Sequence, residues 1–222
     1  MTDVGNQIIS LDFFFHWTLI SKKLISPIKK EQHPMKIIDC KKLTDKKWLN
    51  LFDVSYLDKS GHEKLWQVAT RDSVPRCISG NFNQPDAVLM IPFHRTEQKL
   101  VIIREYRVPL AGYQYEFPAG LIDKGESLEE ASRRELKEET GLDLTHINKI
   151  SPVLYSTAGM TDESLVLVYC ECDGMPSSAE NQGTEDIEVY LVSPDEAEQL
   201  LSDASQKMDV KTWLALSQFL NK

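Results

Sequence analysis

Residues 120–142, GLIDKGESLEEASRRELKEETGL, decide how this 222-residue chain folds. Their middle predicts a short helix, because Ser127 can cap its N-terminus and Glu130, three residues later, completes a capping box. Gly141 stands where such a helix would end in a left-handed residue. The apolar side of the helix is expected from Leu128, Ala131 and Leu136.

Three glutamates of this stretch predict a shared acidic face. Glu135, Glu138 and Glu139 are three and four residues apart, so their carboxylates lie on one side of a helix. Like charges at that spacing destabilise an isolated helix by roughly 0.2–0.5 kcal/mol per pair. A hard divalent cation such as Mg²⁺ would reverse the sign of that contribution. For the glutamates alone, a solvated acidic face is the more common explanation.

The flanking residues decide between these interpretations. They match every fixed position of the Nudix box, GX5EX7REUXEEXGU, in which U is a bulky aliphatic residue. The matching residues are Gly120, Glu126, Arg134, Glu135, Leu136, Glu138, Glu139, Gly141 and Leu142. The chain therefore resembles the Nudix hydrolases. The resemblance implies a loop–helix–loop that binds Mg²⁺ and hydrolyses a diphosphate linked to a nucleoside.

The resemblance also implies a metal site. Glu135 and Glu139 would bind Mg²⁺, or Mn²⁺ as a substitute, with help from the backbone carbonyl of Ala119. Glu138 would be a further ligand or a base. Metal ions neutralise the charge of adjacent phosphates, which otherwise repels a nucleophilic water. Arg134 is expected to hold the glutamates by ion pairs.

A base or water-positioning residue is still needed. ADP-ribose pyrophosphatases, one branch of the family, place a catalytic glutamate in the loop that corresponds to residues 180–186. Glu185 is the best match by its distance from the strand expected at 187–192, and we predict it to be catalytic together with Glu138. An ordinary charged loop, which also contains Glu180 and Asp186, is the competing interpretation.

Further residues resemble the same branch over roughly 40–220. Arg71 and Arg107 match arginines that contact the diphosphate, for which a guanidinium fork is well suited. Glu116, within YEFPAGLID at 115–123, matches a residue that contacts the nucleotide or terminal ribose. Trp48 and Trp66 match tryptophans that sandwich the adenine; without the resemblance, both would be assigned to packing. Two nearby arginines could substitute for the diphosphate pair: Arg76 and Arg104.

One departure widens the range of substrates. The branch often has proline in an SPG-like loop after the box, and Ala158 stands at that position here. The expected activity is hydrolysis of ADP-ribose or a related ADP-sugar to AMP and a sugar phosphate. A Nudix enzyme for a GDP-sugar or a dinucleotide is the first alternative. A non-catalytic ADP-ribose-sensing module is the second, although such modules usually lack the box carboxylates that are intact here.

Composition and net charge limit the classes of molecule that this protein is expected to bind. A formal charge of −9 disfavours a nucleic acid polymer, because no basic patch is available to pair with its phosphates. A small nucleoside diphosphate sugar remains possible when cations bridge the two. The four cysteines form no CxxC pair, and Cys170 and Cys172 are expected to be buried free thiols in a strand, which fits a cytoplasmic protein.

The chain is expected to form an α/β (α+β) Nudix fold, with a mixed sheet between helices and an N-terminal antiparallel hairpin. We expect residues 1–34 to be an extension outside the fold, 35–85 a dimerising hairpin region, and 86–222 the Nudix domain. The extension has no stretch long enough to span a membrane, so no membrane partner is expected. The branch resemblance implies a homodimer.

The pattern of apolar residues places the other elements. Strands are predicted at 49–56, 63–69, 87–93, 100–105, 113–117, 150–155, 165–171 and 187–192. Residues 156–164 are a predicted loop. Helices are predicted at 194–202 and 207–221, the last with Trp213, Leu216 and Leu220 on its apolar side.

Overall fold

The computed structural model describes residues 35–221 except for 180, 182 and 184. The predicted extension at 1–34 lies outside the described residues. Within the part of the chain that the structure describes, no helix combines the length and apolar character that crossing a bilayer requires.

The N-terminal strands form a separate antiparallel sheet of three strands in the order β1-β2-β3. Its strands are β1 (Lys36–Lys42), β2 (Asn50–Leu57) and β3 (Glu63–Thr70). Strand β2 alternates along its length, so that Phe52 and Val54 pack with Val68 of β3 in a small core of their own. The predicted hairpin is thereby confirmed, and β1 extends it at one edge.

The larger sheet has eight strands, with the path β11-β5-β4-β10-β8 and three short strands paired at its margins. Strand β10 runs parallel to β4, and the other pairs are antiparallel, which confirms the predicted mixed sheet. The strands are β4 (Ala87–His94), β5 (Lys99–Arg107), β6 (Gly112–Glu116), β7 (Ala119–Leu121), β8 (Asp143–Ile150), β9 (Leu154–Tyr155), β10 (Ser164–Asp173) and β11 (Ile187–Val192).

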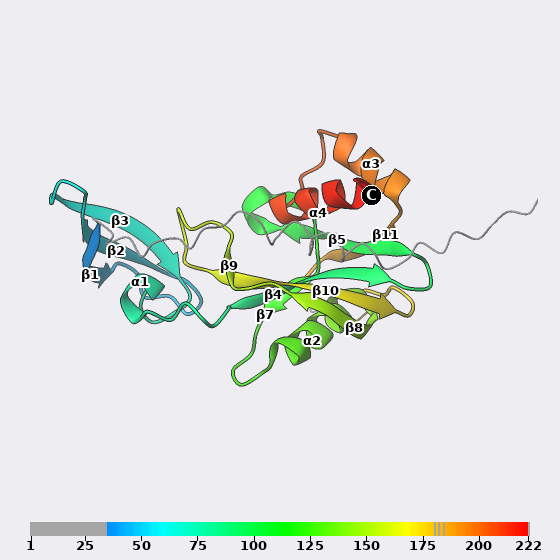
Figure 1. Ribbon diagram of the computed structural model, residues 1–222, viewed down its shortest axis with the longest axis horizontal. Coiled ribbons are helices and arrows are strands. Elements are labelled where there is room, and N and C mark those ends of the chain that lie inside the picture. The colour runs from blue at the N-terminus through cyan, green and yellow to red at the C-terminus, as the bar shows by residue number, and fades with distance from the viewer. Residues whose placement is uncertain (1–34, 180, 182, 184, 222) are drawn as a thin grey trace, which may run out of the picture. The chain divides into compact units, whose positions relative to one another are not determined.

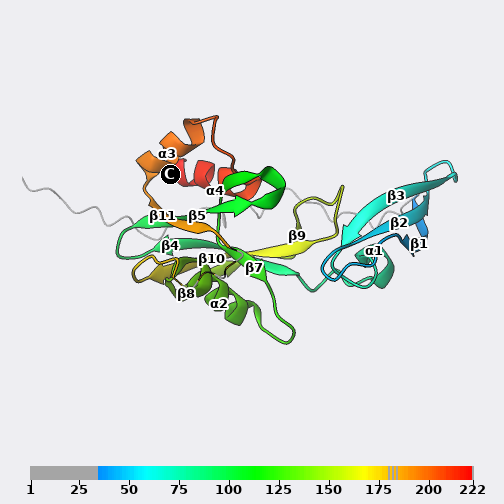
Figure 2. The same ribbon diagram turned by 180° about the vertical axis from the view of Figure 1, so that it is seen from behind.

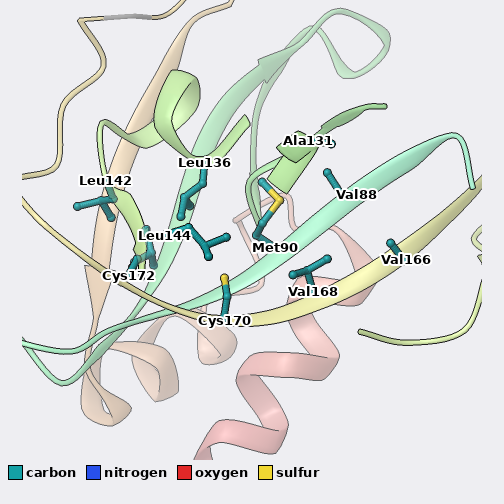
Figure 3. Packing of buried hydrophobic residues seen from close by; sticks show 11 residues of the cluster. Val88, Met90, Ala131, Leu136, Leu142, Leu144, Val166, Val168, Cys170 and Cys172 are labelled. Atoms are coloured by element: carbon teal, nitrogen blue, oxygen red, sulfur yellow. The ribbon is translucent and has the colours of Figure 1, made fainter. Parts of the chain in front are cut away.

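Helices cover both faces of this sheet (Figures 1 and 2). Helix α2 (Leu128–Thr140) lies on one face, and α3 (Pro194–Ser202) and α4 (Val210–Leu220) lie on the other. Between α2 and the sheet, side chains from the helix and from β4, β8 and β10 form the main core (Figure 3). This core includes the fully buried thiols of Cys170 and Cys172, as predicted.

The ends of α2 are those that the sequence predicts. The Ser127 side chain accepts a hydrogen bond from the backbone of Glu130, and the Glu130 side chain bonds back to the Ser127 backbone. Gly141 ends the helix with φ of 71°, a conformation that favours glycine. Ala131 and Leu136 are fully buried, and Leu128 packs against the same core.

Several elements differ from the predicted ones. The strand predicted at 150–155 is wrong: β8 ends at Ile150, and only Leu154 and Tyr155 form the short β9. Strand β8 escaped prediction because it lies at a sheet edge, where polar residues are tolerated. The short α1 (Arg76–Ser79) and the 3-10 turn η2 (Val108–Leu110) were not predicted either.

Helix α4 also departs from its prediction. It begins at Val210, capped by Asp209, and its buried residues are Thr212, Leu216 and Phe219. The Trp213 side chain is 50% exposed, so its assignment to the apolar side is wrong.

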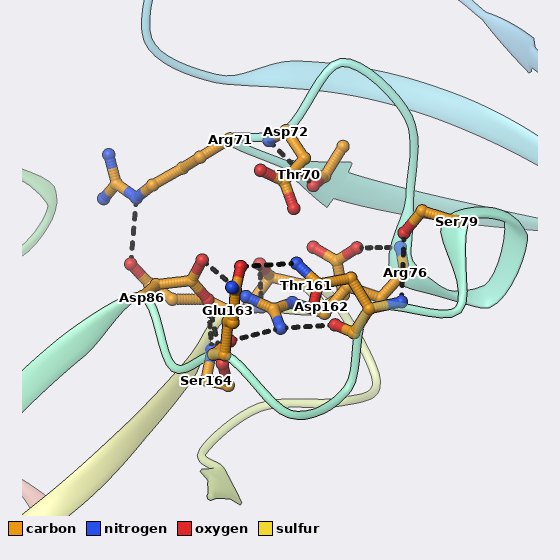
Figure 4. A network of polar contacts seen from close by, with 12 residues as sticks. Thr70, Arg71, Asp72, Arg76, Ser79, Asp86, Thr161, Asp162, Glu163 and Ser164 are labelled. Atoms are coloured by element: carbon orange, nitrogen blue, oxygen red, sulfur yellow. Dashed lines mark hydrogen bonds and ion pairs between the residues drawn. The ribbon is translucent and has the colours of Figure 1, made fainter. Parts of the chain in front are cut away.

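A buried arginine ties the segment between β3 and β4 to the large sheet (Figure 4). The Arg76 guanidinium donates to the carbonyls of Asn81 and Gln84, at 2.7 Å each, and to Asp86 Oδ1 at 2.6 Å. Asp86 Oδ2 accepts from the backbone and hydroxyl of Ser164, the first residue of β10. This network anchors the segment that leads from the small sheet into the large one.

Candidate active site

Glu139 of α2 lies against the backbone of β7. Its side chain is only 7% exposed, and Oε2 accepts a hydrogen bond from the Ala119 N–H at 2.9 Å. Burial raises the pKa of Glu139 well above its usual value, and the charges of Glu135 and Glu105 raise it further. The structure thus brings the predicted ligands Glu139 and Ala119 into contact.

The Glu135 side chain packs against Gly120, which follows Ala119 in β7. A Cβ built on Gly120 would lie 1.9 Å from the carboxyl carbon of Glu135, so the glycine leaves the space that this carboxylate fills. Burial raises the pKa of Glu135, and Arg134 partly opposes that shift. Both predicted carboxylate ligands therefore lie along β7, which contains Ala119 and Gly120.

Arg134 makes the ion pairs expected of it. Its guanidinium lies 2.8 Å from Glu126 and 2.6 Å from Glu135, and it donates to the Leu121 carbonyl at 3.0 Å. Glu138 is 3.5 Å from the same guanidinium. Glu126 also accepts from the Asp123 N–H in the loop before α2, at 2.9 Å, so its carboxylate joins that loop to Arg134. Arg134 orients the acidic face of the helix.

A second group of charges comes from β5 and β6. Arg107 donates from Nε to Glu116 at 2.7 Å, and its Nη2 is 2.8 Å from Glu105. Burial raises the pKa of Glu105 to about 7, against the opposing effect of Arg107. The charge of Glu139 acts on Arg107, which places this group next to the box helix.

Sequence reasoning did not single out Glu105. The signal available was the alternation along β5, which puts Glu105 on the same side as Ile103, and Ile103 pairs with Glu116. A buried glutamate two residues from a predicted diphosphate-binding arginine would have been a reasonable candidate.

The structure also brings Glu185 to this group. The Glu185 charge contributes to the raised pKa values of Glu105 and Glu135, which come from a strand and a helix respectively. Glu185 is half-buried and stands just before β11. The predicted loop glutamate thus lies near enough to Glu105 and Glu135 for its charge to raise their pKa values.

The chemistry of these residues fits a divalent cation. Among the described residues, no three acidic, histidine or cysteine side chains are already grouped as metal ligands. Two carboxylates and a backbone carbonyl are nevertheless the hard oxygen ligands that Mg²⁺ and Mn²⁺ accept. Glu135 and Glu139 repel each other in a buried site, and a cation would relieve that repulsion. The residues that would hold it are Glu135, Glu139 and Ala119.

Three predicted substrate-binding residues lie elsewhere in the chain. Arg71 follows β3 and pairs with Glu163 at 2.9 Å (Figure 4). Trp66 of β3 lines an apolar cavity of about 480 Å³ with residues of the small sheet and the 155–162 loop, and no box carboxylate lines that cavity. Trp48 is 68% exposed, with the Lys47 ammonium 4.1 Å from its ring centre. Within 35–221, no ring contact joins Trp48 to Trp66.

Comparison with known proteins agrees with this geometry. The family model of the NUDIX domain matches residues 83–214. The chain belongs to the Nudix family. The match covers the large sheet, the box helix, α3 and the start of α4, and it begins after the small N-terminal sheet.

Two relatives match 66% and 72% of this chain. A Caenorhabditis elegans protein named nudix hydrolase 2 is 36% identical over 155 residues, 66% of this chain and 66% of the relative. The ADP-ribose pyrophosphatase of Saccharomyces cerevisiae is 34% identical over 164 residues, 72% of this chain and 68% of the relative. The chain thus spans about two thirds of the length of these relatives.

A solved structure shows the same Nudix fold. The crystal structure of an ADP compounds hydrolase superposes with a TM-score of 0.64, covering 86% of this chain and 95% of that one. At 23% identity this likeness supports the fold alone.

Proposed function

We propose that this Nudix protein hydrolyses the diphosphate of ADP-ribose or a related ADP-sugar, giving AMP and a sugar phosphate. The observation that carries the proposal is the pair of carboxylates held against the Ala119–Gly120 backbone, the buried Glu139 and the partly buried Glu135. Buried acids with raised pKa values and no apolar packing role are typical of catalytic sites. The family and the name of the yeast relative support the reaction class.

Each part of the site has a distinct task. When bound, Mg²⁺ or Mn²⁺ neutralises the diphosphate and polarises the phosphorus. Arg134 and the Ala119 N–H hold Glu135 and Glu139 in place before substrate arrives. Glu185 orients or deprotonates the attacking water, and Glu138 is a second candidate for that role.

We assign Arg107 and Arg71 to binding the phosphates of the substrate. Arg107 already lies among the site carboxylates, where its guanidinium can exchange Glu116 or Glu105 for phosphate oxygens. Glu116, once released, is available to the nucleotide or its ribose. Arg71 would leave Glu163, a half-exposed partner, to reach the diphosphate. Both arginines thus exchange an acidic partner for the substrate.

The exposed tryptophans support assembly into a homodimer. Trp48 and Trp66 are 68% and 51% exposed, and large exposed aromatic residues are typical of binding surfaces. We assign them to the adenine, with at least one ring contributed by the partner subunit. The four free cysteines fit a reducing compartment, and we place the protein in the cytoplasm.

A substrate panel tests the proposal. The purified protein is incubated with ADP-ribose, ADP-glucose, a GDP-sugar and a dinucleotide, each with Mg²⁺ and with Mn²⁺. Chromatography should detect AMP and the sugar phosphate from the ADP-sugars, and chelation should stop their release. Faster turnover of the GDP-sugar would contradict the assignment to ADP-sugars. Binding of ADP-ribose without turnover would indicate a sensing module.

A further inference from the structure

Asp186, the residue after Glu185, is attached to two strands. Its backbone carbonyl accepts from the Tyr106 N–H of β5 at 3.1 Å. Its side chain accepts a hydrogen bond from the Tyr113 hydroxyl of β6, with 2.5 Å between Oη and Oδ2. These two hydrogen bonds hold Asp186, the residue before β11, by its backbone carbonyl and by its side chain.

These contacts lie on the face of the sheet opposite the box carboxylates. Tyr106 pairs with Tyr113, whereas Glu105 and Arg107 point the other way because side chains alternate along a strand. Asp186 lies beside Tyr106, so its neighbour Glu185 projects toward the side of Glu105. That direction agrees with the effect of the Glu185 charge on Glu105 and Glu135.

Tyr113 is itself held in a defined orientation. The Arg104 guanidinium lies 4.2 Å from the centre of its ring, and Tyr106 packs edge-on at a centroid distance of 5.5 Å. The bond to Asp186 raises the pKa of Tyr113, so the hydroxyl remains a donor at neutral pH. These contacts hold the Tyr113 ring in place, and its hydroxyl donates the hydrogen bond that holds the Asp186 carboxylate.

We propose that Tyr113 is a positioning residue, which fixes Asp186 on one face of the sheet and thereby aims Glu185 at the catalytic carboxylates on the other. The inference rests on the proposed function of Glu185. Tyr113 itself touches neither the substrate nor the box residues in this assignment. Its hydroxyl acts through the strand backbone, so its removal should affect the chemical step more than substrate binding.

The test is Tyr113→Phe, which keeps the ring and deletes the hydroxyl. We expect kcat on ADP-ribose to fall roughly tenfold, with KM changed less than about twofold, because one hydrogen bond to a charged group is lost. Tyr190→Phe is the matched control: it deletes a hydroxyl that donates to Glu188 at 2.6 Å on the same face. An equal loss in both variants, or an unchanged kcat in Tyr113→Phe, would overturn the proposal.

Two further variants identify the path of the effect. Asp186→Asn keeps an acceptor oxygen and should retain most of the kcat, whereas Asp186→Ala should match Tyr113→Phe. In the Glu185→Gln background, Tyr113→Phe should cause little additional loss. A full tenfold loss in that background would mean that Tyr113 acts on another residue.

Hydrogen exchange, which is measured without substrate turnover, separates this inference from the proposed function. Hydrogen exchange in the peptide that contains Glu185 and Asp186 should accelerate in Tyr113→Phe and stay unchanged in Tyr190→Phe. If Glu185→Gln keeps full activity while the exchange result holds, the role of Glu185 is wrong and the attachment through Tyr113 is right. Unchanged exchange in Tyr113→Phe would contradict the attachment of Asp186 through the Tyr113 hydroxyl.

Discussion

Acidic residues in this site occupy positions where water cannot fully solvate them. Glu105, Glu116 and Glu139 are each less than 9% exposed, and two arginines, Arg107 and Arg134, lie among them and their neighbours. Burial favours the protonated form of a carboxyl, and so does a second carboxyl nearby. Burial and neighbouring carboxyls therefore disfavour the charged forms of these residues, and the individual carboxylates can be tested one at a time.

Glu139→Gln should remove most of the activity while leaving the fold intact. The amide keeps the shape of the side chain but lacks the charge that binds a cation, so kcat should fall roughly 10²-fold or more. Without metal, the free energy of unfolding should be unchanged or slightly raised, because a repulsive charge is lost. Steady-state kinetics at saturating Mg²⁺ and denaturant unfolding measure both quantities.

Glu129→Gln is the matched control for that variant. Glu129 lies on the same helix but is exposed, and it pairs with Arg133 at 2.8 Å. Its kcat should equal that of the wild type. Near-normal turnover of Glu139→Gln would show that the metal site is assigned to the wrong carboxylate.

Glu105 predicts a pH dependence of stability. Its pKa is about 7 in the folded protein and near 4.5 in the unfolded chain, so between these values only the folded state is protonated. Its stabilising contribution is complete below about pH 4.5 and is lost as the pH rises through about 7, a change on the order of 3 kcal/mol. Glu105→Gln should therefore match the wild type at pH 4 and exceed its stability at pH 8, both without metal.

Denaturant unfolding of the two proteins at the two pH values checks this prediction. The variant also removes the Glu105 charge that raises the pKa of Glu139, so the difference between the two proteins reports Glu105 together with its effect on Glu139. Equal stabilities at pH 8 would mean that the folded pKa of Glu105 is close to its ordinary value.

At the scale of elements, the buried charge of Arg76 holds the segment between β3 and β4 in place. The Arg76 side chain is 3% exposed, and Asp86 is its carboxylate partner. The neighbouring Arg71–Glu163 pair is similar in chemistry, but its side chains are 42% and 35% exposed. Solvent screening makes the second pair weak, whereas breaking the first leaves a buried charge without its counterion.

Asp86→Ala should therefore destabilise the fold by about 3 kcal/mol. It removes the acceptor of Arg76 and of Ser164, so the start of β10 also loses hydrogen bonds. Glu163→Gln, the control from the exposed pair, should change the free energy of unfolding by less than about 1 kcal/mol. Urea titrations of both variants give the comparison, and equal losses would contradict the assigned difference in burial.

At the scale of the whole molecule, substrate binding depends on assembly if the adenine lies between tryptophans of two subunits. Trp66→Ala should then raise KM for ADP-ribose about ten- to a hundredfold, equivalent to roughly 1–3 kcal/mol of base stacking. The value of kcat should change much less, because the ring contacts ground state and transition state alike. Light scattering should give the mass of a dimer.

Trp213→Ala provides the matched control for this prediction. Trp213 on α4 is 50% exposed, against 51% for Trp66, and no substrate role is assigned to it. Its KM should equal that of the wild type. A monomeric mass together with an unchanged KM for Trp66→Ala would exclude the adenine clamp; a lower melting temperature alone would assign Trp66 to packing of the hairpin.

The sequence by itself determined the features that depend on spacing within a few residues. The capping box of Ser127 and Glu130 and the left-handed Gly141 both follow from the geometry of one helix. Partners in a helix lie three or four residues apart, so their identity can be read from the chain. The alternation of β2 was predicted for the same local reason.

Only the tertiary structure decided which distant residues meet. Glu105 enters the site because β5 pairs with both β6 and β11, and neither register can be read from local spacing. Strand β8 forms because β10 offers it an edge, despite its polar sequence. Trp213 remains exposed because the face of α4 that is buried depends on the sheet beneath it. Such contacts are set by how strands and helices pack, which a single helical or strand period does not encode.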